Sequence, residues 1–309
     1  MTPLEDERII NLMEPGHTGC AGCGQSIGAR LVIKAAGPRT IIANSTGCLE
    51  VFTTTYPRSS WEVPWIHSLF ENSAAVASGM EVALKAMGRY ENVKIIAQAG
   101  DGGTADIGMG CLSGMFERGH DILYVCYDNE GYMNTGYQRS SLTPPGARTT
   151  TSPPGPMSWG NKTRKKNLPL IAVAHGVPYV ATATPAAPRD LMRKVKKALE
   201  IEGPKYLHLL VPCVPGWGIE SELSVEMARL ATETYLFPVL EIEEGVITKV
   251  KRPKERKAVE DYLRPQRRFA HLFKPGGEPI LEELREIAEE NSRLEPGPAV
   301  LFGGAMPEE

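Results

Sequence analysis

The chain has 309 residues, 42% of them apolar, so it can bury a full α/β core as one large domain or as a domain with an appendage. Its net charge of −3 gives no whole-chain electrostatic reason to bind nucleic acid or an anionic membrane surface. Residues 1–11 are mostly polar, and no later segment approaches the length of an apolar membrane span. We therefore expect a cytoplasmic globular protein without nucleic-acid or membrane partners.

Predicted helices and short apolar strands alternate through the first half of the chain. Ser26 is a candidate N-cap for the first helix, and Gly37 is placed to end it. Small side chains dominate the second helix, which suits close backbone packing. The expected elements are helix 26–36, strand 40–43, a helix from 72 or 73 to 87, strand 93–99, helix 105–118 and strand 122–127.

The same alternation continues with helix 168–175, strand 179–183, helix 188–201 and strand 206–211. Short apolar strands separated by helices are typical of a parallel sheet that is buried on both faces. The predicted fold class is therefore α/β, with a parallel sheet flanked by helices on both faces. We assign residues 1–240 to this domain.

Two segments interrupt the pattern. Residues 143–160 are rich in proline and glycine and show no periodicity, which indicates a long loop that belongs either to an active site or interface or to the bare surface. Residues 241–309 form a predicted C-terminal extension with a hairpin across Gly245, a charged stretch and one polar helix. This extension either contacts another subunit or is a solvated tail.

Six cysteines are too few for a disulfide scaffold, and a reducing compartment would keep them as thiols. Cys20 and Cys23 form a C-x2-C pair among glycines, which allow the backbone to curl around one metal centre. Cys48 and Cys213 each follow a predicted parallel strand, and the carboxyl ends of such strands converge on one crevice. Four thiolates gathered there would suit a [4Fe-4S] cluster or a structural zinc ion.

The alternative is that Cys48 and Cys213 are buried small apolar residues. Cys111 and Cys126 fall inside a predicted helix and a predicted strand, so we assign both to the core. His17 adjoins the Cys20 and Cys23 loop as a ligand or, more commonly for a lone histidine, as a hydrogen-bonding neighbour.

A Gly-Asp-Gly-Gly sequence at 100–103 directly follows the strand at 93–99 and precedes a helix. Backbone N–H groups at such a junction can receive a diphosphate, and Asp101 can hold Mg²⁺. At the end of the next strand, the Asn129 side chain and the Gly131 carbonyl offer two further oxygens. Consecutive parallel strands bring both loops to the same edge. The alternative is two ordinary turns.

Four motifs in order resemble the β subunits of pyruvate synthase and related 2-oxoacid:ferredoxin oxidoreductases. They are Gly-His-x-x-Cys-x-x-Cys-Gly at 16–24, Gly-Asp-Gly-Gly-Thr-Ala-Asp-Ile-Gly at 100–108, Tyr-Asp-Asn-Glu-Gly-Tyr-Met-Asn-Thr-Gly at 127–136 and Pro-Cys-x-Pro-Gly-Trp at 212–217. The resemblance covers roughly residues 14–240. It implies the pyrophosphate-type domain of the thiamine-diphosphate-binding fold.

The resemblance also implies a role for each matching residue. One [4Fe-4S] cluster would be bound by Cys20, Cys23, Cys48 and Cys213, and Mg²⁺ by Asp101, Asn129 and the Gly131 carbonyl. Thiamine diphosphate and substrate would contact Gly47, Cys48, Gly100, Asp101, Gly102, Gly103, Asn129 and Asn134, with Asn134 as the catalytic residue.

The implied reaction is oxidative decarboxylation of pyruvate, or its reversal, with coenzyme A and ferredoxin. The sequence lacks a second cysteine-rich run and an obvious second thiamine-binding half. The expected partners are therefore an alpha subunit that covers the cofactor, together with gamma-type and ferredoxin-like subunits, and the chain alone should be inactive.

The substrate stays open among pyruvate, other 2-oxoacids and oxalate. Tyr56, Arg58 and the loop at 143–160 are candidates for a carboxylate contact, with a surface arginine as the alternative for Arg58. Two further classes compete: a thiamine-dependent decarboxylase half with structural zinc, and a non-enzymatic scaffold that has lost the site. The intact Asp101, Asn129 and cysteines argue against the scaffold.

Overall fold

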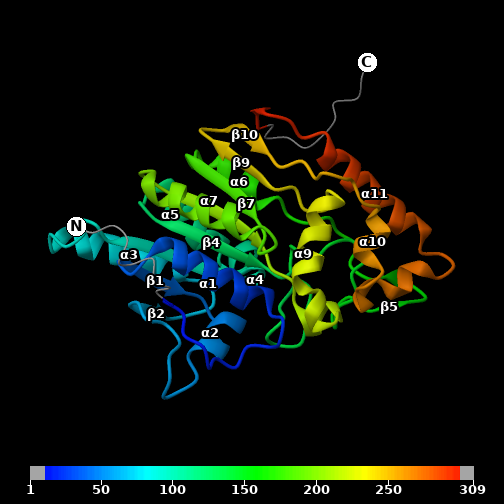
Figure 1. Ribbon diagram of the computed structural model, residues 1–309, viewed down its shortest axis with the longest axis horizontal. Coiled ribbons are helices and arrows are strands. Elements are labelled where there is room, and N and C mark those ends of the chain that lie inside the picture. The colour runs from blue at the N-terminus through cyan, green and yellow to red at the C-terminus, as the bar shows by residue number, and fades with distance from the viewer. Residues whose placement is uncertain (1–10, 300–309) are drawn as a thin grey trace.

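The computed structural model describes residues 11–299, through which one nine-stranded sheet runs (Figure 1). The strand order is β11-β10-β9-β7-β8-β4-β3-β1-β2, and the strands from β7 to β2 are parallel. These parallel strands are β1 (Thr40–Asn44), β2 (Trp65–His67), β3 (Lys94–Gly100), β4 (Leu123–Asp128), β7 (Tyr179–Ala183) and β8 (Lys205–Leu210). The expectations for residues 1–10 and 300–309 lie outside the described part of the chain.

Helices cover both faces of the parallel sheet, which confirms the predicted fold class. Helices α1 (Gly24–Ala36) and α7 (Pro188–Glu200) pack together on one face, and α3 (Ser73–Ala86), α5 (Met109–Glu117) and α6 (Leu168–Ala174) lie on the other. The side chains of β4 alternate between the two cores: Val125 belongs to the first and Cys126 to the second. Cys126 is thus a core residue, as predicted.

Two local expectations are wrong, and one strand was not predicted. Helix α1 begins at Gly24, with Cys23 at the cap position, and the Ser26 hydroxyl donates to the Cys23 carbonyl at 2.9 Å instead of capping the helix. The helix predicted at 105–118 is α5, which begins only at Met109, and a separate short helix, α4 (Asp101–Ala105), stands where a turn was expected; the chain turns between them, where Gly108 approaches the Gly103 backbone. The short edge strand β2 has no clear alternation and was not predicted.

The sheet continues into the C-terminal segment. Strands β9 (Leu240–Glu243) and β10 (Val246–Val250) form an antiparallel pair, and β9 also pairs with β7. Strand β11 (Gly297–Pro298) completes this edge. A third core, which includes Trp217, joins helices α9 (Ser224–Glu233), α10 (Val259–Leu263), η2 (Arg267–Phe273) and α11 (Glu278–Ser292). These helices lie at the end of the molecule opposite α3 (Figure 1).

The remaining elements are short and connect the larger ones. They are α2 (Cys48–Thr53), α8 (Val214–Trp217), η1 (Ser221–Leu223), β5 (Pro154–Gly155) and β6 (Ser158–Trp159). Within residues 11–299, no helix combines the length and the apolar character needed to cross a membrane.

Glu241 of β9 ties the C-terminal segment to the sheet through a buried carboxylate. It accepts hydrogen bonds from Tyr179 at 2.9 Å and from Arg193 at 2.5 and 3.1 Å. Burial by itself would raise the pKa of Glu241, but these hydrogen bonds and nearby cations outweigh burial and lower it to about 2.

A group with a depressed folded-state pKa stabilises the fold above its unfolded pKa, and this stabilisation is lost as the pH falls through the folded value. We therefore expect Glu241→Gln to be less stable than wild type at pH 7. The difference in stability between the two proteins should shrink between about pH 4.3 and pH 2. Thermal unfolding at several pH values measures this difference. Glu244→Gln, at an exposed position, serves as the control. A stability difference between Glu241→Gln and wild type that stayed constant on acidification would contradict the lowered pKa of Glu241.

Candidate functional site

The candidate site lies at the carboxyl ends of four strands that are neighbours in the sheet, in the order β8, β4, β3, β1. Because parallel strands end at the same edge, the loops that follow them lie side by side. These four loops carry, in the same order, Cys213, Asn129, Asp101 and Cys48. Segments more than a hundred residues apart in the sequence therefore form one rim.

A first cavity of about 240 Å³ opens at this rim. Its lining contains every residue that the sequence assigned to the diphosphate cofactor and its metal ion: Gly47, Cys48, Gly100, Asp101, Gly102, Gly103, Asn129, Gly131 and Asn134. Thr46, Phe70, Tyr132 and Met133 complete much of the wall. We refer to this space as the cofactor cavity.

Close packing explains why Gly102 must be glycine. A Cβ atom at this position would lie 2.4 Å from the ring of Tyr132, which is held in place by a 2.7 Å hydrogen bond from its hydroxyl group to Asp106. A side chain would displace the aromatic wall and narrow the cavity. No side chain at Gly102 therefore covers the backbone, so that a phosphate group can approach the N–H groups of residues 100–103 closely.

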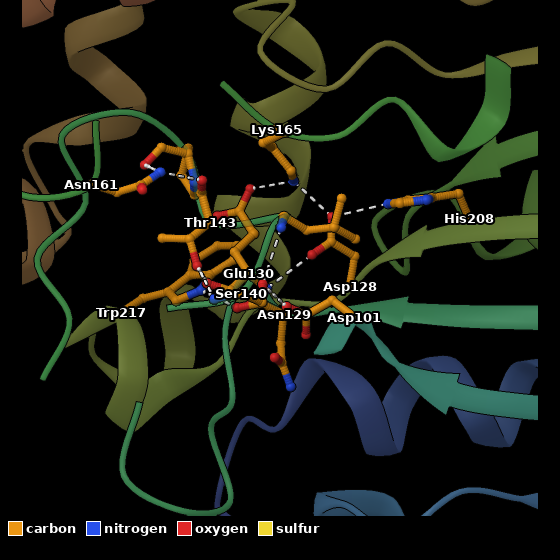
Figure 2. A network of polar contacts seen from close by, with 12 residues as sticks. Asp101, Asp128, Asn129, Glu130, Ser140, Thr143, Asn161, Lys165, His208 and Trp217 are labelled. Atoms are coloured by element: carbon orange, nitrogen blue, oxygen red, sulfur yellow. Dashed lines mark hydrogen bonds and ion pairs between the residues drawn. The ribbon is translucent and has the colours of Figure 1, made fainter. Parts of the chain in front are cut away.

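Two buried carboxylates near the cavity have opposite electrostatic surroundings. Asp128 accepts hydrogen bonds from Lys165 at 2.7 Å and from His208 at 2.9 Å (Figure 2), and although burial would raise its pKa, the Lys165 charge and these hydrogen bonds lower it. Asp101 is 1% exposed and is hydrogen-bonded by Ser140 at 2.5 Å, with no ion-pair partner in the described structure. Burial, followed by repulsion from Asp128, raises the pKa of Asp101 well above its usual range.

Three groups that can offer an oxygen lie close together: the Asp101 carboxylate, the Asn129 amide and the Gly131 carbonyl. One terminal atom of the Asn129 amide lies 2.8 Å from the Gly131 carbonyl oxygen and 2.9 Å from Oδ1 of Asp101. With nitrogen in that place the amide donates two hydrogen bonds; with oxygen there, the three groups form one face of a cation site. Oxygens bound at right angles to one Mg²⁺ ion lie about 3 Å apart, since each is about 2.1 Å from the ion. The residues present therefore fit Mg²⁺.

A polar network holds the loop that follows β4 (Figure 2). Lys165 donates to Glu130 at 2.8 Å, and the fully buried Arg268 donates to the other Glu130 oxygen at 2.5 Å. The Arg268 guanidinium also lies 4.0 Å from the ring of Trp217, whose indole N–H donates to the Asn129 carbonyl at 2.8 Å. The C-terminal segment, which carries Arg268, thus fixes the position of Asn129.

A second cavity of about 220 Å³ is lined by all four cysteines that the sequence singled out: Cys20, Cys23, Cys48 and Cys213. Desolvation and the neighbouring thiols raise the pKa of Cys48 to about 12, and desolvation raises that of Cys213 to about 12. Thiols in this environment stay protonated until a bound metal deprotonates them. We refer to this space as the cysteine cavity.

The chain approaches itself closely at the start of α1. Gly24 donates its N–H to the Pro212 carbonyl at 3.0 Å, and a Cβ atom on Gly24 would lie 2.6 Å from the Pro212 nitrogen. Glycine here lets the Cys20 and Cys23 loop reach the Cys213 loop. His17 accepts a hydrogen bond from the Gly19 N–H at 3.2 Å and packs on Phe52, so its ring supports this loop.

The two cavities share a wall. The residues that line both are Gln25, Cys48, Asn129, Met133 and Asn134. The two cavities are therefore adjacent, and these five residues contribute to the boundary between them. The sequence assigned no role to Met133, although it lies in the motif at 127–136, and it did not identify Gln25, Lys165 or Arg268, which no motif or spacing marks.

Several candidates lie away from both cavities. Tyr56 and Arg58 are on an exposed loop, and Cys111 packs against the second core. In the loop at 143–160, residues 143–147 are buried, and Thr143 donates to the Glu130 carbonyl at 2.9 Å. This loop therefore packs against the segment that follows β4 and does not line either cavity. Among residues 11–299, no three His, Cys, Asp or Glu side chains are grouped to hold a single metal ion.

Comparisons with known proteins agree with the geometry. Residues 45–209, more than half of the chain, match the family described as thiamine pyrophosphate enzyme, C-terminal TPP binding domain. Those residues include Cys48, Asp101 and Asn129 and end just before the Cys213 loop.

Curated relatives extend the similarity over most of the chain. Pyruvate synthase subunit PorB of Methanosarcina barkeri is 56% identical over 277 residues, covering 89% of this chain and 94% of the relative. The PorB subunit of Thermotoga maritima is 45% identical and covers 92% of this chain and 90% of the relative. Ketoisovalerate oxidoreductase subunit VorB of Pyrococcus furiosus is also 45% identical, with 89% and 92% covered.

Among known structures, a 2-oxoglutarate:ferredoxin oxidoreductase from Magnetococcus marinus shares the fold. The TM-score is 0.55 at 23% identity, and the match covers 69% of this chain and 77% of the other. At this identity the likeness speaks for the fold alone.

Proposed function

The chain belongs to the family of thiamine-diphosphate-binding β subunits of 2-oxoacid:ferredoxin oxidoreductases, and on that basis we propose that it is the subunit of a pyruvate synthase that holds thiamine diphosphate, Mg²⁺ and one [4Fe-4S] cluster. The single observation that carries this proposal is the shared wall between the cofactor cavity and the cysteine cavity. A thiamine enzyme without electron transfer has no need of four thiols there.

The cofactor cavity supports the first part of the proposal. Bound thiamine diphosphate supplies a nucleophilic carbon and an electron sink for removing CO2 from a 2-oxoacid. Asp101, the Asn129 amide and the Gly131 carbonyl would hold Mg²⁺ against the diphosphate, and the bare backbone at 100–103 would receive the phosphate oxygens. Gly47 and Asn134 would contact the reacting part of the cofactor, with Asn134 placed to orient substrate.

The cysteine cavity favours a cluster as its occupant rather than a zinc ion. Four sulfurs on one zinc converge to about 2.3 Å from a single point. Here Cys20, Cys23, Cys48 and Cys213 surround a space of about 220 Å³ instead. A [4Fe-4S] cluster fits this spread, because each of its iron atoms takes a different cysteine. The cluster would take electrons one at a time toward ferredoxin.

The relatives favour pyruvate as substrate. The PorB subunits, which are named for pyruvate synthase, are 45–56% identical, and the VorB subunit named for ketoisovalerate is 45% identical. Other 2-oxoacids and oxalate remain alternative substrates to be assayed, because thiamine diphosphate could decarboxylate each of them. Coenzyme A would accept the acyl group.

The proposed partner subunits rest on the one domain that the family model matches. Residues 45–209 match one thiamine-binding domain, so we propose that an alpha subunit covers the other half of the cofactor. Gamma-type and ferredoxin-like subunits would complete the electron path.

The test is to purify the complex anaerobically from cells that co-express all subunits and to assay viologen reduction that depends on coenzyme A. Pyruvate should give the highest kcat/KM in a panel with 2-oxoisovalerate, 2-oxoglutarate and oxalate. The chain alone should give no turnover. Robust turnover by the isolated chain, or a preference for another acid, would overturn the corresponding part of the proposal.

A further inference from the structure

Gln25 occupies an unusual position in the wall between the two cavities. It lies in the first turn of α1, two residues after Cys23, and is 4% exposed. Its side chain lines the cofactor cavity and the cysteine cavity alike. Yet Oε1 of the amide is fully buried and has no hydrogen-bond partner in the described structure.

A second buried glutamine shows what ordinary packing looks like in this protein. Gln98 of β3 is 1% exposed, donates to Asn44 at 2.8 Å and accepts from the Tyr127 hydroxyl group at 3.1 Å. Buried amides are nearly always satisfied in this way, because an unpaired one loses its hydrogen bonds to water without compensation. The unpaired Oε1 position of the Gln25 amide therefore indicates a partner that occupies one of the cavities.

The chemistry of the cysteine cavity determines which end of the amide is used there. Sulfides and cysteine thiolates of a cluster accept hydrogen bonds and donate none. Only the N–H2 end of Gln25 can bind to them, and rotating the amide exchanges nitrogen and oxygen without changing its shape. The carbonyl end then faces away from the cluster.

We propose that the side-chain amide of Gln25 donates a hydrogen bond to a sulfur of the cluster and thereby raises the cluster's reduction potential. This inference rests on the proposed [4Fe-4S] site. Gln25 is a positioning residue in this role: it touches the electron acceptor, and it stabilises the reduced state because that state carries more negative charge on sulfur.

The test compares wild-type protein with Gln25→Met, which has nearly the same shape and no N–H group. The full chain is purified anaerobically with its cluster, and the midpoint potential is measured by a dye-mediated titration followed by absorbance and electron paramagnetic resonance. We expect a shift to lower potential in Gln25→Met. Gln25→Glu, which also lacks the donor, should shift the potential in the same direction.

Gln98→Met is the matched control, because it removes a buried glutamine that lines neither cavity. It should lose thermal stability, since Asn44 and Tyr127 lose their partner, and keep the wild-type potential. Gln25→Met should behave in the opposite way before the cluster is inserted: stability of the metal-free chain stays equal or rises, because an unpaired polar group has been removed.

Equal potentials in wild type and Gln25→Met, with the cluster present in both, overturn the inference and leave the proposed function standing. A shift of the same size in Gln98→Met also overturns it, since the effect would then come from general loosening. A wild-type chain that binds no iron overturns the proposed function itself.

Discussion

Replacing Asp101 by asparagine is expected to abolish 2-oxoacid oxidation by the assembled enzyme. The substitution keeps the size of the side chain and removes the one charged oxygen ligand among the three groups that face the proposed Mg²⁺ position. Loss of a residue that only supports a metal ligand costs roughly 10–100-fold in affinity. Loss of a charged ligand itself should weaken thiamine diphosphate binding by more than that.

The measurement is thermal unfolding with and without thiamine diphosphate and Mg²⁺. A ligand at 100 times its Kd stabilises the folded state by about 2.7 kcal/mol, and Asp101→Asn should lose this stabilisation. Without ligand the variant should be no less stable than wild type, because it removes a buried carboxylate that has no cationic partner and lies near Asp128.

Asp121→Asn is the control for a general loss of stability. Asp121 lies just before the amino end of β4, away from the carboxyl ends of the strands that carry the site. It forms an ion pair with Lys205 and accepts a hydrogen bond from Tyr90. This variant should be less stable but should still be stabilised by the cofactor. Full cofactor binding by Asp101→Asn would show that the metal is held elsewhere.

Replacing Cys213 by alanine is expected to remove the cluster and, with it, reduction of viologen or ferredoxin. Cys213 is the cysteine most distant in sequence from the C-x2-C pair, and its position depends on β8 and on Trp217. Activity should fall at least about 100-fold, by the same comparison with the loss of a supporting partner. Stabilisation by thiamine diphosphate should persist, because Cys213 does not line the cofactor cavity.

Cys111→Ala separates the ligand role from the mere loss of a thiol. Cys111 packs against the second core and lines neither cavity. Its substitution should leave both iron content and turnover near wild type. Iron retention by Cys213→Ala together with full turnover would remove this cysteine from the proposed cluster.

The parts of the fold that local sequence determines were predictable. Short apolar strands separated by helices indicated a parallel sheet, and strand 179–183 was placed without error. The loops with Cys48, Asp101 and Asn129 could be assigned to one edge because they follow consecutive parallel strands. The same rule places Cys48 and Cys213 at this edge, whereas Cys20 and Cys23 reach it through the tertiary contact between Gly24 and Pro212.

Other features depend on tertiary contacts and leave no local signal. Strand β2 is only three residues long, and the break between α4 and α5 results from the approach of Gly108 to Gly103. The role of Arg268 requires knowing that the C-terminal segment folds back onto the site. Gln25 is noticeable only because a buried atom lacks a partner.

The central claim is that the four thiols beside the cofactor cavity hold iron and sulfide. Metal and sulfide analysis of anaerobically purified chain tests it most directly. We expect four iron atoms and four sulfides per chain, and a brown colour with absorbance at about 400 nm that bleaches on reduction. One zinc ion per chain and no iron would contradict the account.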